Sequence, residues 1–230
     1  SNFKGDEDFY PRYVEISFSN VCNFKCAYCG PPFSSKWMEE VKQKGPYDLN
    51  TWSYNMIDPN ETPIPEREEN PYIEAFWKWF PEAVKHMHTF RITGGEPLLS
   101  KHTQRVIDYL IEHPQPNLKF AINSNGCPPK DLWKKFTKSI KKLEDSNAIR
   151  EFCLYTSAES TGPQAEYSRF GMDWRLFTDN IEYFARHTGS KISFMSAFNI
   201  YSLPTFKSFL IWVLYLKSTY WGKHQGNQRI

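Results

Sequence analysis

Residues 19–32, SNVCNFKCAYCGPP, place Cys22, Cys26 and Cys29 in a C-x3-C-x2-C frame, although the whole chain has only five cysteines. Three thiols are an odd number for disulfides and one too few for a closed tetrahedral zinc site. The first residues are polar and acidic rather than a secretory signal, which predicts a cytoplasmic protein. In that reducing compartment clustered thiols are more often metal ligands than disulfides. The segment therefore predicts a metal centre with one ligand position left to fill.

Composition narrows the class of protein. A chain of 230 residues is long enough for one domain with a full core. The formal net charge of +2 is too small to suggest nucleic acid or an anionic membrane as partner. The longest apolar run, FLIWVLYL at 209–216, is too short to span a bilayer and predicts a buried helix. Aromatic residues make up 17% of the chain, so either the core or a binding surface is rich in rings.

Segments with strand and helix patterns alternate along the chain. Strands are predicted at 13–20, 89–93, 117–125, 150–160 and 191–200. Helices are predicted at 34–44, 72–87 (bent or broken at Pro81), 100–114, 130–144, 174–187 and 203–218. Strands separated by helices predict an α/β fold with a parallel sheet and right-handed crossovers. Five strand–helix units favour an open, curved sheet over a closed barrel.

The domain organisation expected from this pattern is simple. An N-terminal extension over 1–12 precedes a core over 13–220. A long insertion over 45–71, rich in Pro, Asn and Glu, interrupts the core as a surface loop. A tail over 221–230 closes the chain.

Residues suited to binding and chemistry follow each predicted strand. The cysteines follow the first strand, Gly94-Gly95-Glu96 the second, and 123–126, NSNG, the third. Residues 157–160, SAES, end the fourth strand, and Asn199 ends the fifth. The carboxyl ends of parallel strands share one edge, which is where such sheets build their sites. We therefore expect one site at that edge.

Two metal centres are compatible with the cysteine segment. Structural zinc needs a fourth ligand, and the nearest suitably spaced histidines, His86 and His88, precede the second strand at the wrong edge. A [4Fe–4S] cluster held by three thiolates leaves one iron open to an outside ligand. The cluster is the favoured interpretation, and zinc stays as the alternative.

At this point the motifs resemble those of the radical S-adenosylmethionine (SAM) superfamily. The cysteine frame with Tyr28 before its last cysteine, GGEP at 94–97 and NSNG are similar to that family's signatures in this order. SAES resembles a fourth motif, with Ala158 and Glu159 in place of Leu and Asp. CGPPFSSKW at 29–37 and EYSRFG at 166–171 are further similar to the SPASM/twitch group within it. The resemblance runs from about residue 12 to about 220 and implies a partial (β/α) barrel.

The resemblance also implies cofactors and roles. Members hold a [4Fe–4S] cluster and SAM, cleave SAM reductively with an electron from a flavodoxin- or ferredoxin-type donor, and form a 5′-deoxyadenosyl radical. That radical abstracts hydrogen from a substrate, here an unknown peptide, protein or small metabolite. Cys22, Cys26 and Cys29 are the implied iron ligands. The implied SAM-binding residues are Tyr28, Gly94, Gly95, Glu96, Ser124, Asn125, Ser157, Glu159 and Arg169, with Arg169 facing the SAM carboxylate and Glu96 the ammonium.

Two departures and several alternatives accompany this expectation. The family core has six units and no sixth strand is seen, so either the chain stops before it or it is supplied differently. No cysteine follows Cys153, so one cluster at most is expected. Catalytic residues are not identified, although Cys127 is a candidate for delivering a hydrogen atom to a product radical. The rival functions are a non-enzymatic iron–sulfur or zinc protein of this fold and SAM-dependent alkyl transfer.

Overall fold

A computed structural model describes residues 9–48, 57, 63–65 and 68–221. Its main sheet has five parallel strands in the order β1-β3-β4-β5-β7. The strands are β1 (Tyr13–Ser17), β3 (Thr89–Thr93), β4 (Gln115–Ser124), β5 (Ile149–Ser157) and β7 (Lys191–Met195). Because the spatial order follows the chain order, each strand lies beside its predecessor, as the alternating pattern predicted. The predicted α/β fold, a partial barrel whose parallel sheet stays open, is confirmed.

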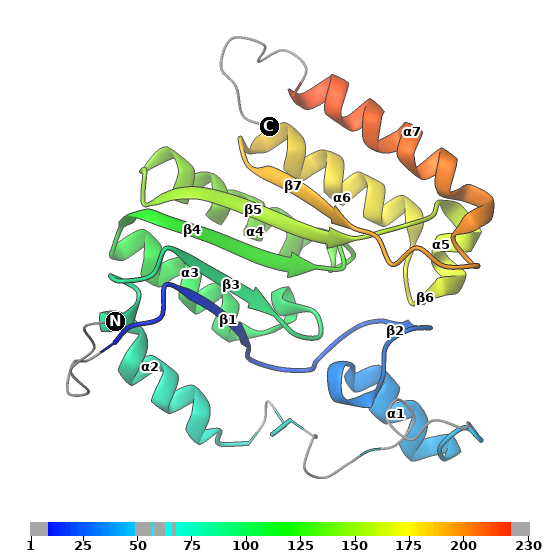
Figure 1. Cartoon of the computed structure of the whole chain (residues 1–230), viewed down its shortest axis with the longest axis horizontal. Helices are drawn as coiled ribbons and strands as arrows, with labels where there is room; N and C mark the ends of the chain where they lie inside the picture. The colour runs from blue at the N-terminus through cyan, green and yellow to red at the C-terminus, as the bar shows by residue number, and fades with distance from the viewer. Residues whose placement is uncertain (1–8, 49–56, 58–62, 66–67, 222–230) are drawn as a thin grey trace, which may run out of the picture.

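Seven α-helices connect or follow these strands in the described residues. They are α1 (Ser35–Lys44), α2 (Pro71–Ala83), α3 (Lys101–Glu112), α4 (Lys130–Asp145), α5 (Gly162–Ser168), α6 (Trp174–His187) and α7 (Phe206–Leu216). Figure 1 shows α3, α4 and α6 behind the sheet, with its other face toward the viewer. The sheet is therefore covered by helices on one face.

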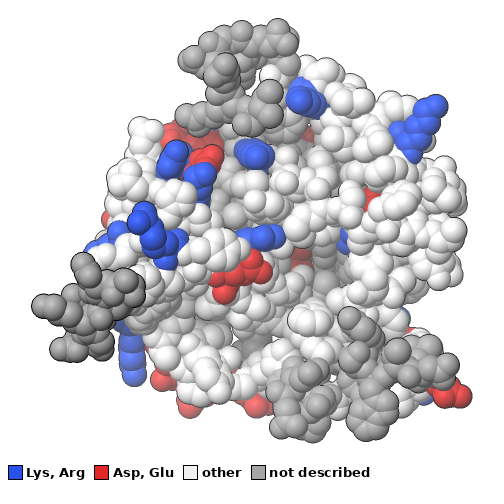
Figure 2. Space-filling model, in the orientation of Figure 1, with Lys and Arg blue, Asp and Glu red and all other residues white. Residues whose placement is uncertain are grey.

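Side chains alternate between the two faces of the sheet as strand geometry requires. In β3, Phe90 and Ile92 are fully buried toward the helices, while Arg91 between them lies on the open face. On that face Arg91 pairs with Glu15, and Lys119 pairs with Glu151. Figure 2 shows this face, with basic and acidic side chains side by side over the part of the sheet where the strands begin.

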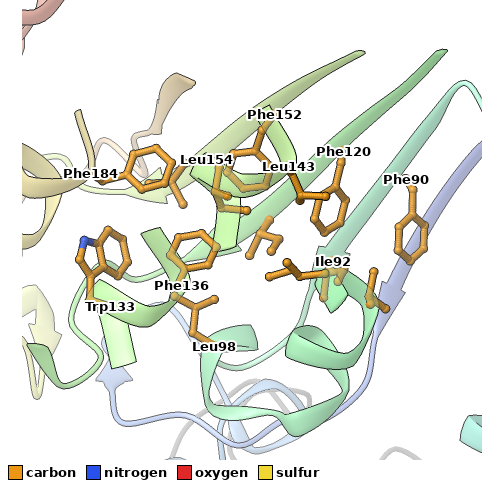
Figure 3. Close-up of a cluster of buried hydrophobic side chains, with 14 of the residues drawn as sticks. Phe90, Ile92, Leu98, Phe120, Trp133, Phe136, Leu143, Phe152, Leu154 and Phe184 are labelled. Atoms are coloured by element: carbon orange, nitrogen blue, oxygen red, sulfur yellow. The ribbon is translucent and has the colours of Figure 1, made fainter. Parts of the chain in front are cut away.

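The core between sheet and helices is a layer of aromatic rings. Phe120 on β4 contacts Phe90 on β3 and Phe152 on β5, with ring centroids 6.0 and 5.5 Å apart. Phe152 in turn meets Phe184 of α6, and Trp133 and Phe136 of α4 complete the layer (Figure 3). The high aromatic content thus serves the core, because Phe side chains fill the space that one sheet and its helices enclose.

Helix α2 shows no break at Pro81, which was one of the two outcomes expected there; a bend was the other. The helix continues through Pro81 and ends at Ala83, and the Val84 N–H still donates to the Phe80 carbonyl over 2.9 Å. A proline removes only its own N–H from the helix, and here just two helical residues follow it. Pro71 opens the helix at a position where proline is favoured, after the Asn70 side chain caps Tyr72.

Helix α7 contradicts the prediction of a buried helix. Phe209 and Leu216 are buried, but Leu210, Ile211 and Leu214 are 45%, 58% and 63% exposed. An apolar run does not tell how many sides of a helix have neighbours. Here β7 is the last strand of the described sheet, so α7 packs on one side only, through contacts such as those of Trp212 with Trp174, Phe177 and Phe194.

Three further predictions need correction or completion. Strand β7 ends at Met195, so Asn199 lies in the following loop, where its side chain bonds Ala197 and Tyr201 locally. Cys153, which the sequence places inside a strand where a cysteine is more often a small buried hydrophobe, lies half-buried on the open face. Most of the predicted insertion at 45–71 lies outside the described residues. The sequence also missed α5 and a small antiparallel pair, β2 (Lys25–Cys26) with β6 (Arg169–Phe170).

Short helical turns complete the described secondary structure. Three 3-10 turns span Pro31–Phe33, Pro97–Leu99 and Leu203–Thr205, and a π-helical turn spans Lys217–Trp221. None of the helices in the described residues has the length and hydropathy needed to cross a membrane.

Candidate active site

The cysteine segment leaves β1 and crosses the carboxyl edge of the sheet. The backbone N–H groups of Gly95 and Glu96 donate to the carbonyls of Ser19 and Val21, over 3.2 and 2.7 Å. Farther along, the Trp37 indole N–H donates to the Cys26 carbonyl over 3.0 Å. Strand β2 then pairs with β6, which sets Cys26 opposite Arg169. The segment is therefore fixed to β3, to α1 and to β6.

Gly94 and Gly95 make this close approach possible. Gly94 has a φ of +119°, and a Cβ there would lie 2.4 Å from the Ser17 Oγ. A Cβ on Gly95 would lie 2.4 Å from the Val21 carbonyl oxygen. Both distances are far below van der Waals contact, so any larger residue would push the cysteine segment away. The two glycines thus serve the chain's own cysteine loop, and their predicted approach to SAM stays a prediction.

The three thiols share one partly buried region. All three are free and half-buried. Burial raises the pKa of Cys22 and of Cys26 to about 11 and raises that of Cys29. Each thiolate also raises the pKa of another: Cys26 acts on Cys22, Cys29 on Cys26, and Cys22 on Cys29. The sulfurs therefore lie within electrostatic range of one another.

This donor set fits an iron–sulfur cluster better than a single ion. A structural zinc ion needs a fourth protein ligand, whereas a [4Fe–4S] cluster held by three thiolates keeps one iron open. A four-iron cluster binds each thiolate at a different iron, so its ligands stand farther apart than those of one zinc ion. The cysteines must lose their thiol protons to bind a metal. Because their pKa values are raised, the thiols stay protonated until a metal replaces the protons.

Donors to the sulfurs differ from one cysteine to the next. The Phe24 N–H donates to the Cys22 Sγ over 3.4 Å, and the Asn125 Nδ2 lies 3.9 Å from the same sulfur. The Arg169 Nη1 lies 4.0 Å from the Cys26 Sγ. The Cys29 thiol instead donates to the Gly30 carbonyl. One sulfur is thus next to neutral donors and another next to a cation.

Glu96 is a buried bridge between strands β3 and β4. It is 1% exposed, and its carboxylate accepts hydrogen bonds from the Leu98 N–H, the Ser124 Oγ and the Asn125 N–H. Burial raises the pKa of Glu96 to about 7, although these donors oppose the shift. The carboxylate is occupied by protein donors, so a direct bond to the SAM ammonium stays a prediction.

Ser124 and Asn125 are likewise engaged within the protein. The Ser124 hydroxyl donates to Glu96 and accepts from the Gly126 N–H over 3.1 Å. The Asn125 Nδ2 donates to the Asn23 Oδ1 over 2.7 Å. Asn23 also donates to the Cys127 carbonyl, so it joins the cysteine segment to the end of β4. Sequence reasoning missed Asn23, for which the only signal is its place inside the cysteine frame.

Arg169, Glu159 and Tyr28 form one buried network. The Arg169 Nε and Nη2 donate to the two Glu159 oxygens over 3.0 and 2.6 Å, and the Tyr28 hydroxyl donates to Glu159 over 2.8 Å. Arg169 and Glu159 are 5% and 1% exposed. Burial, the largest single influence, lowers the pKa of Arg169, but the Glu159 hydrogen bonds together with the charges of Tyr28, Glu159 and Cys26 leave the pKa raised. Two guanidinium nitrogens are thus committed to Glu159 rather than open to a SAM carboxylate.

The remaining candidates are placed as follows. Ser157 is half-buried at the end of β5, opposite Met195. The Tyr28 side chain is partly exposed, and the Arg169 guanidinium lies 5.1 Å from its ring centre. Cys127 is buried and its Sγ contacts the Asp173 carbonyl at 3.5 Å. Because Cys127 faces the core and α6, the structure does not support it as a hydrogen-atom donor.

Comparison with known proteins adds a family and several relatives. Residues 16–199 match the model described as the radical SAM superfamily. A GTP 3′,8-cyclase of Nautilia profundicola is 25% identical over 138 residues, which cover 60% of this chain and 33% of the relative. The enzyme of that name from Sulfurimonas denitrificans is 24% identical over 169 residues, 72% of this chain and 41% of the relative. The enzyme of that name from Campylobacter jejuni RM1221 is 29% identical over 130 residues, which cover 56% of this chain and 31% of the relative.

These matches bear on the expectations above in two ways. The chain spans about a third of the length of the curated relatives that it matches. All three relatives carry the name of one radical SAM reaction, which supports an enzyme with radical chemistry. The matched descriptions do not name the SPASM/twitch group, so that finer resemblance stays a prediction.

Proposed function

The chain belongs to the radical SAM superfamily, and we propose that it cleaves SAM reductively at the carboxyl edge of its sheet to start hydrogen abstraction from a substrate. Members of this superfamily use a [4Fe–4S] cluster and SAM. The observation that carries the proposal is the set of three thiols held at the edge where Gly94, Gly95 and Asn125 converge on their loop. Cys22, Cys26 and Cys29 would hold the cluster.

The cofactors would supply the electron transfer. Cys22, Cys26 and Cys29 would hold a cluster able to relay one electron from a flavodoxin- or ferredoxin-type donor to the SAM sulfonium, the chemistry that would cleave its C5′–S bond and yield a 5′-deoxyadenosyl radical. The chain's own residues supply position and exclusion of water. Five free cysteines suit a reducing compartment, and we propose the cytoplasm.

The side chains of the edge divide into two groups in this proposal. Glu96, Ser124, Asn125, Glu159 and Arg169 are engaged with the protein, so we assign them to holding the site in shape. Contacts with SAM are then left to the Gly94–Glu96 backbone, the Tyr28 ring and Ser157. This division favours a preformed site, whose binding groups do not have to reorganise when SAM arrives.

The substrate is proposed to be a small metabolite, with a peptide as the alternative. The relatives' name states cyclisation of GTP, so GTP is the first compound to test. A nucleotide would be held partly by its charge, which Arg91 on the open face could meet only by exchanging its present partner Glu15. The SPASM/twitch resemblance instead favours a peptide.

The decisive experiment is anaerobic reconstitution with iron and sulfide, followed by dithionite and SAM. The expected result is 5′-deoxyadenosine and about three to four irons per chain in the wild type, and neither in Cys29→Ala. Cys153→Ala is the matched control, because that thiol is half-buried but belongs to β5. It should keep both iron and product. S-adenosylhomocysteine as the product would favour alkyl transfer, and a cluster without 5′-deoxyadenosine would contradict the proposal.

The same assay distinguishes the substrates. With GTP or a peptide added, a substrate should raise 5′-deoxyadenosine formation above the rate without it. Deuterium placed at the position of abstraction should appear in the 5′-deoxyadenosine. If neither class has any effect, the substrate proposal is wrong while SAM cleavage stands on its own measurement.

A further inference from the structure

The positive charge beside Cys26 has so far been given no task beyond holding the site in shape. Two of the three Arg169 nitrogens bind Glu159, and the third, Nη1, points at the Cys26 Sγ from 4.0 Å. Sulfur is a large, diffuse acceptor, and this separation is at the limit for a hydrogen bond to it. When Cys26 is a thiolate, the same contact joins a cation to an anion and becomes charge-assisted.

The position of the guanidinium is determined by three independent contacts. Glu159 holds it in a bidentate pair, which fixes the plane of the guanidinium as well as its distance. The Tyr28 hydroxyl donates to the Glu159 oxygen that also accepts from the Arg169 Nε, and the Tyr28 ring lies beneath the guanidinium. The pairing of β2 with β6 places Cys26 opposite Arg169 in the backbone as well. Arg169 therefore does not reach Cys26 by the chance position of a flexible side chain.

Because Arg169 is buried, its positive charge acts strongly on the Cys26 sulfur. Arg169 is 5% exposed, so water screens its field weakly. Glu159 opposes the field, but it lies on the far side of the guanidinium, so the cation is the nearer charge to the sulfur. No comparable cation contacts Cys22, whose donors among the described residues are the Phe24 N–H and the Asn125 amide.

We propose that Arg169 is a positioning residue that raises the reduction potential of the cluster by holding a buried positive charge against the Cys26 thiolate. The inference rests on the proposed cluster at Cys22, Cys26 and Cys29. Adding one electron to the cluster makes it more negative, so a nearby cation stabilises the reduced form. Hydrogen bonds to the sulfurs and local charge are two of the known controls of cluster potential.

The test is a redox titration of the reconstituted cluster in the absence of SAM and substrate, with the EPR signal of the cluster as the readout. In Arg169→Gln, Glu159 is left facing the cluster, and the reduction equilibrium should fall at least tenfold, which is about 59 mV for one electron. In Glu159→Gln the cation is left uncompensated and the potential should rise. Arg169→Lys keeps the charge and should stay closer to wild type than Arg169→Gln.

A double variant guards against misfolding. Arg169→Gln alone leaves a buried carboxylate without a partner, which is costly in itself. The pair Glu159→Gln/Arg169→Gln leaves no buried charge, and its potential should fall between those of Arg169→Gln and the wild type. Lys119→Gln is the matched control, since it removes a paired cation from β4 five residues, about 16 Å, before the strand end. It should leave the potential unchanged.

The outcomes separate this inference from the proposed function. Equal potentials in the wild type, both single Gln variants and the double variant, with clusters intact, would overturn the role of Arg169 and leave the proposed function standing. A wild-type chain that assembles no cluster would overturn both. The order Glu159→Gln, wild type, double variant, Arg169→Gln, from highest to lowest potential, is the result that supports the inference.

Discussion

The aromatic layer behind the sheet and the polar edge at its carboxyl end are built by opposite means. In the layer, rings such as Phe120 make several contacts each and no single one is indispensable to the geometry. At the edge, directed hydrogen bonds between specific groups set the geometry, as when Glu96 accepts from the end of β4 or Glu159 holds Arg169. The difference teaches that the layer determines how stable the chain is, while the edge determines whether the cysteine loop has its binding shape.

The largest expected effect comes from Gly95→Ala. Its Cβ would lie 2.4 Å from the Val21 carbonyl oxygen, so the cysteine loop must move away. Iron bound after reconstitution should fall at least tenfold, while far-UV circular dichroism stays close to wild type. Gly189→Ala is the control, because its Cβ would meet nothing nearer than 3.9 Å. Full iron content in Gly95→Ala would contradict the claim that the shape of the cysteine loop depends on these specific contacts at the edge.

Phe120→Ala tests the other side of the comparison. Phe120 is 1% exposed, and truncating a buried ring costs about 3–5 kcal/mol of unfolding free energy. Chemical denaturation should show that loss, and the surviving folded protein should still bind iron. Phe170→Ala, at a 61% exposed ring, should cost less than about 1 kcal/mol. Equal losses from the two variants would contradict the assigned layer.

The raised pKa of Glu96 should make the free energy of unfolding depend on pH. Its pKa is about 7 in the folded chain and near 4.5 in the unfolded chain, so the folded state binds the extra proton between these values. The cluster-free protein should therefore lose stability as pH rises from about 4.5 through 7, by at most about 3 kcal/mol. Glu96→Gln should remove this slope. Denaturation midpoints at several pH values measure it, and a slope that persists in the variant would assign it to another group.

The smallest effect is expected on helix α7. Leu214 is 63% exposed, so Leu214→Ser should change the unfolding free energy by less than about 0.5 kcal/mol. Phe209→Ala on the same helix, at a 2% exposed ring, should cost several times more. Thermal unfolding of both variants decides the point. A large loss for Leu214→Ser would restore the sequence's interpretation of α7 as buried.

The sequence predicted the features that depend on local pattern. Alternation of strands and helices was sufficient for the parallel sheet, since each crossover must bring the next strand alongside the last. At the start of α1 the Ser34 side chain accepts the Trp37 N–H, as befits a residue type favoured at helix N-caps. The meeting of the cysteine segment with Gly94, Gly95 and Asn125 followed from their place at strand ends.

Other features depend on contacts that no local pattern reports. The sequence resemblance predicted that Arg169 faces the SAM carboxylate, because a guanidinium suits a carboxylate. It could not show that Arg169 binds the chain's own Glu159 instead. It missed the pairing of β2 with β6, since two-residue strands have no periodicity. It misjudged α7, because apolar composition does not say which neighbours a helix has.

The pairing of Cys26 with Arg169 has a consequence for biosynthesis. A ribosome delivers the cysteines early, but the strand that fixes Cys26 is made more than 140 residues later. Domains acquire their long-range contacts only once both partners have emerged. Delivery of iron and sulfide before that time would meet three thiols on an unanchored loop, so maturation of this centre is expected to follow translation rather than accompany it.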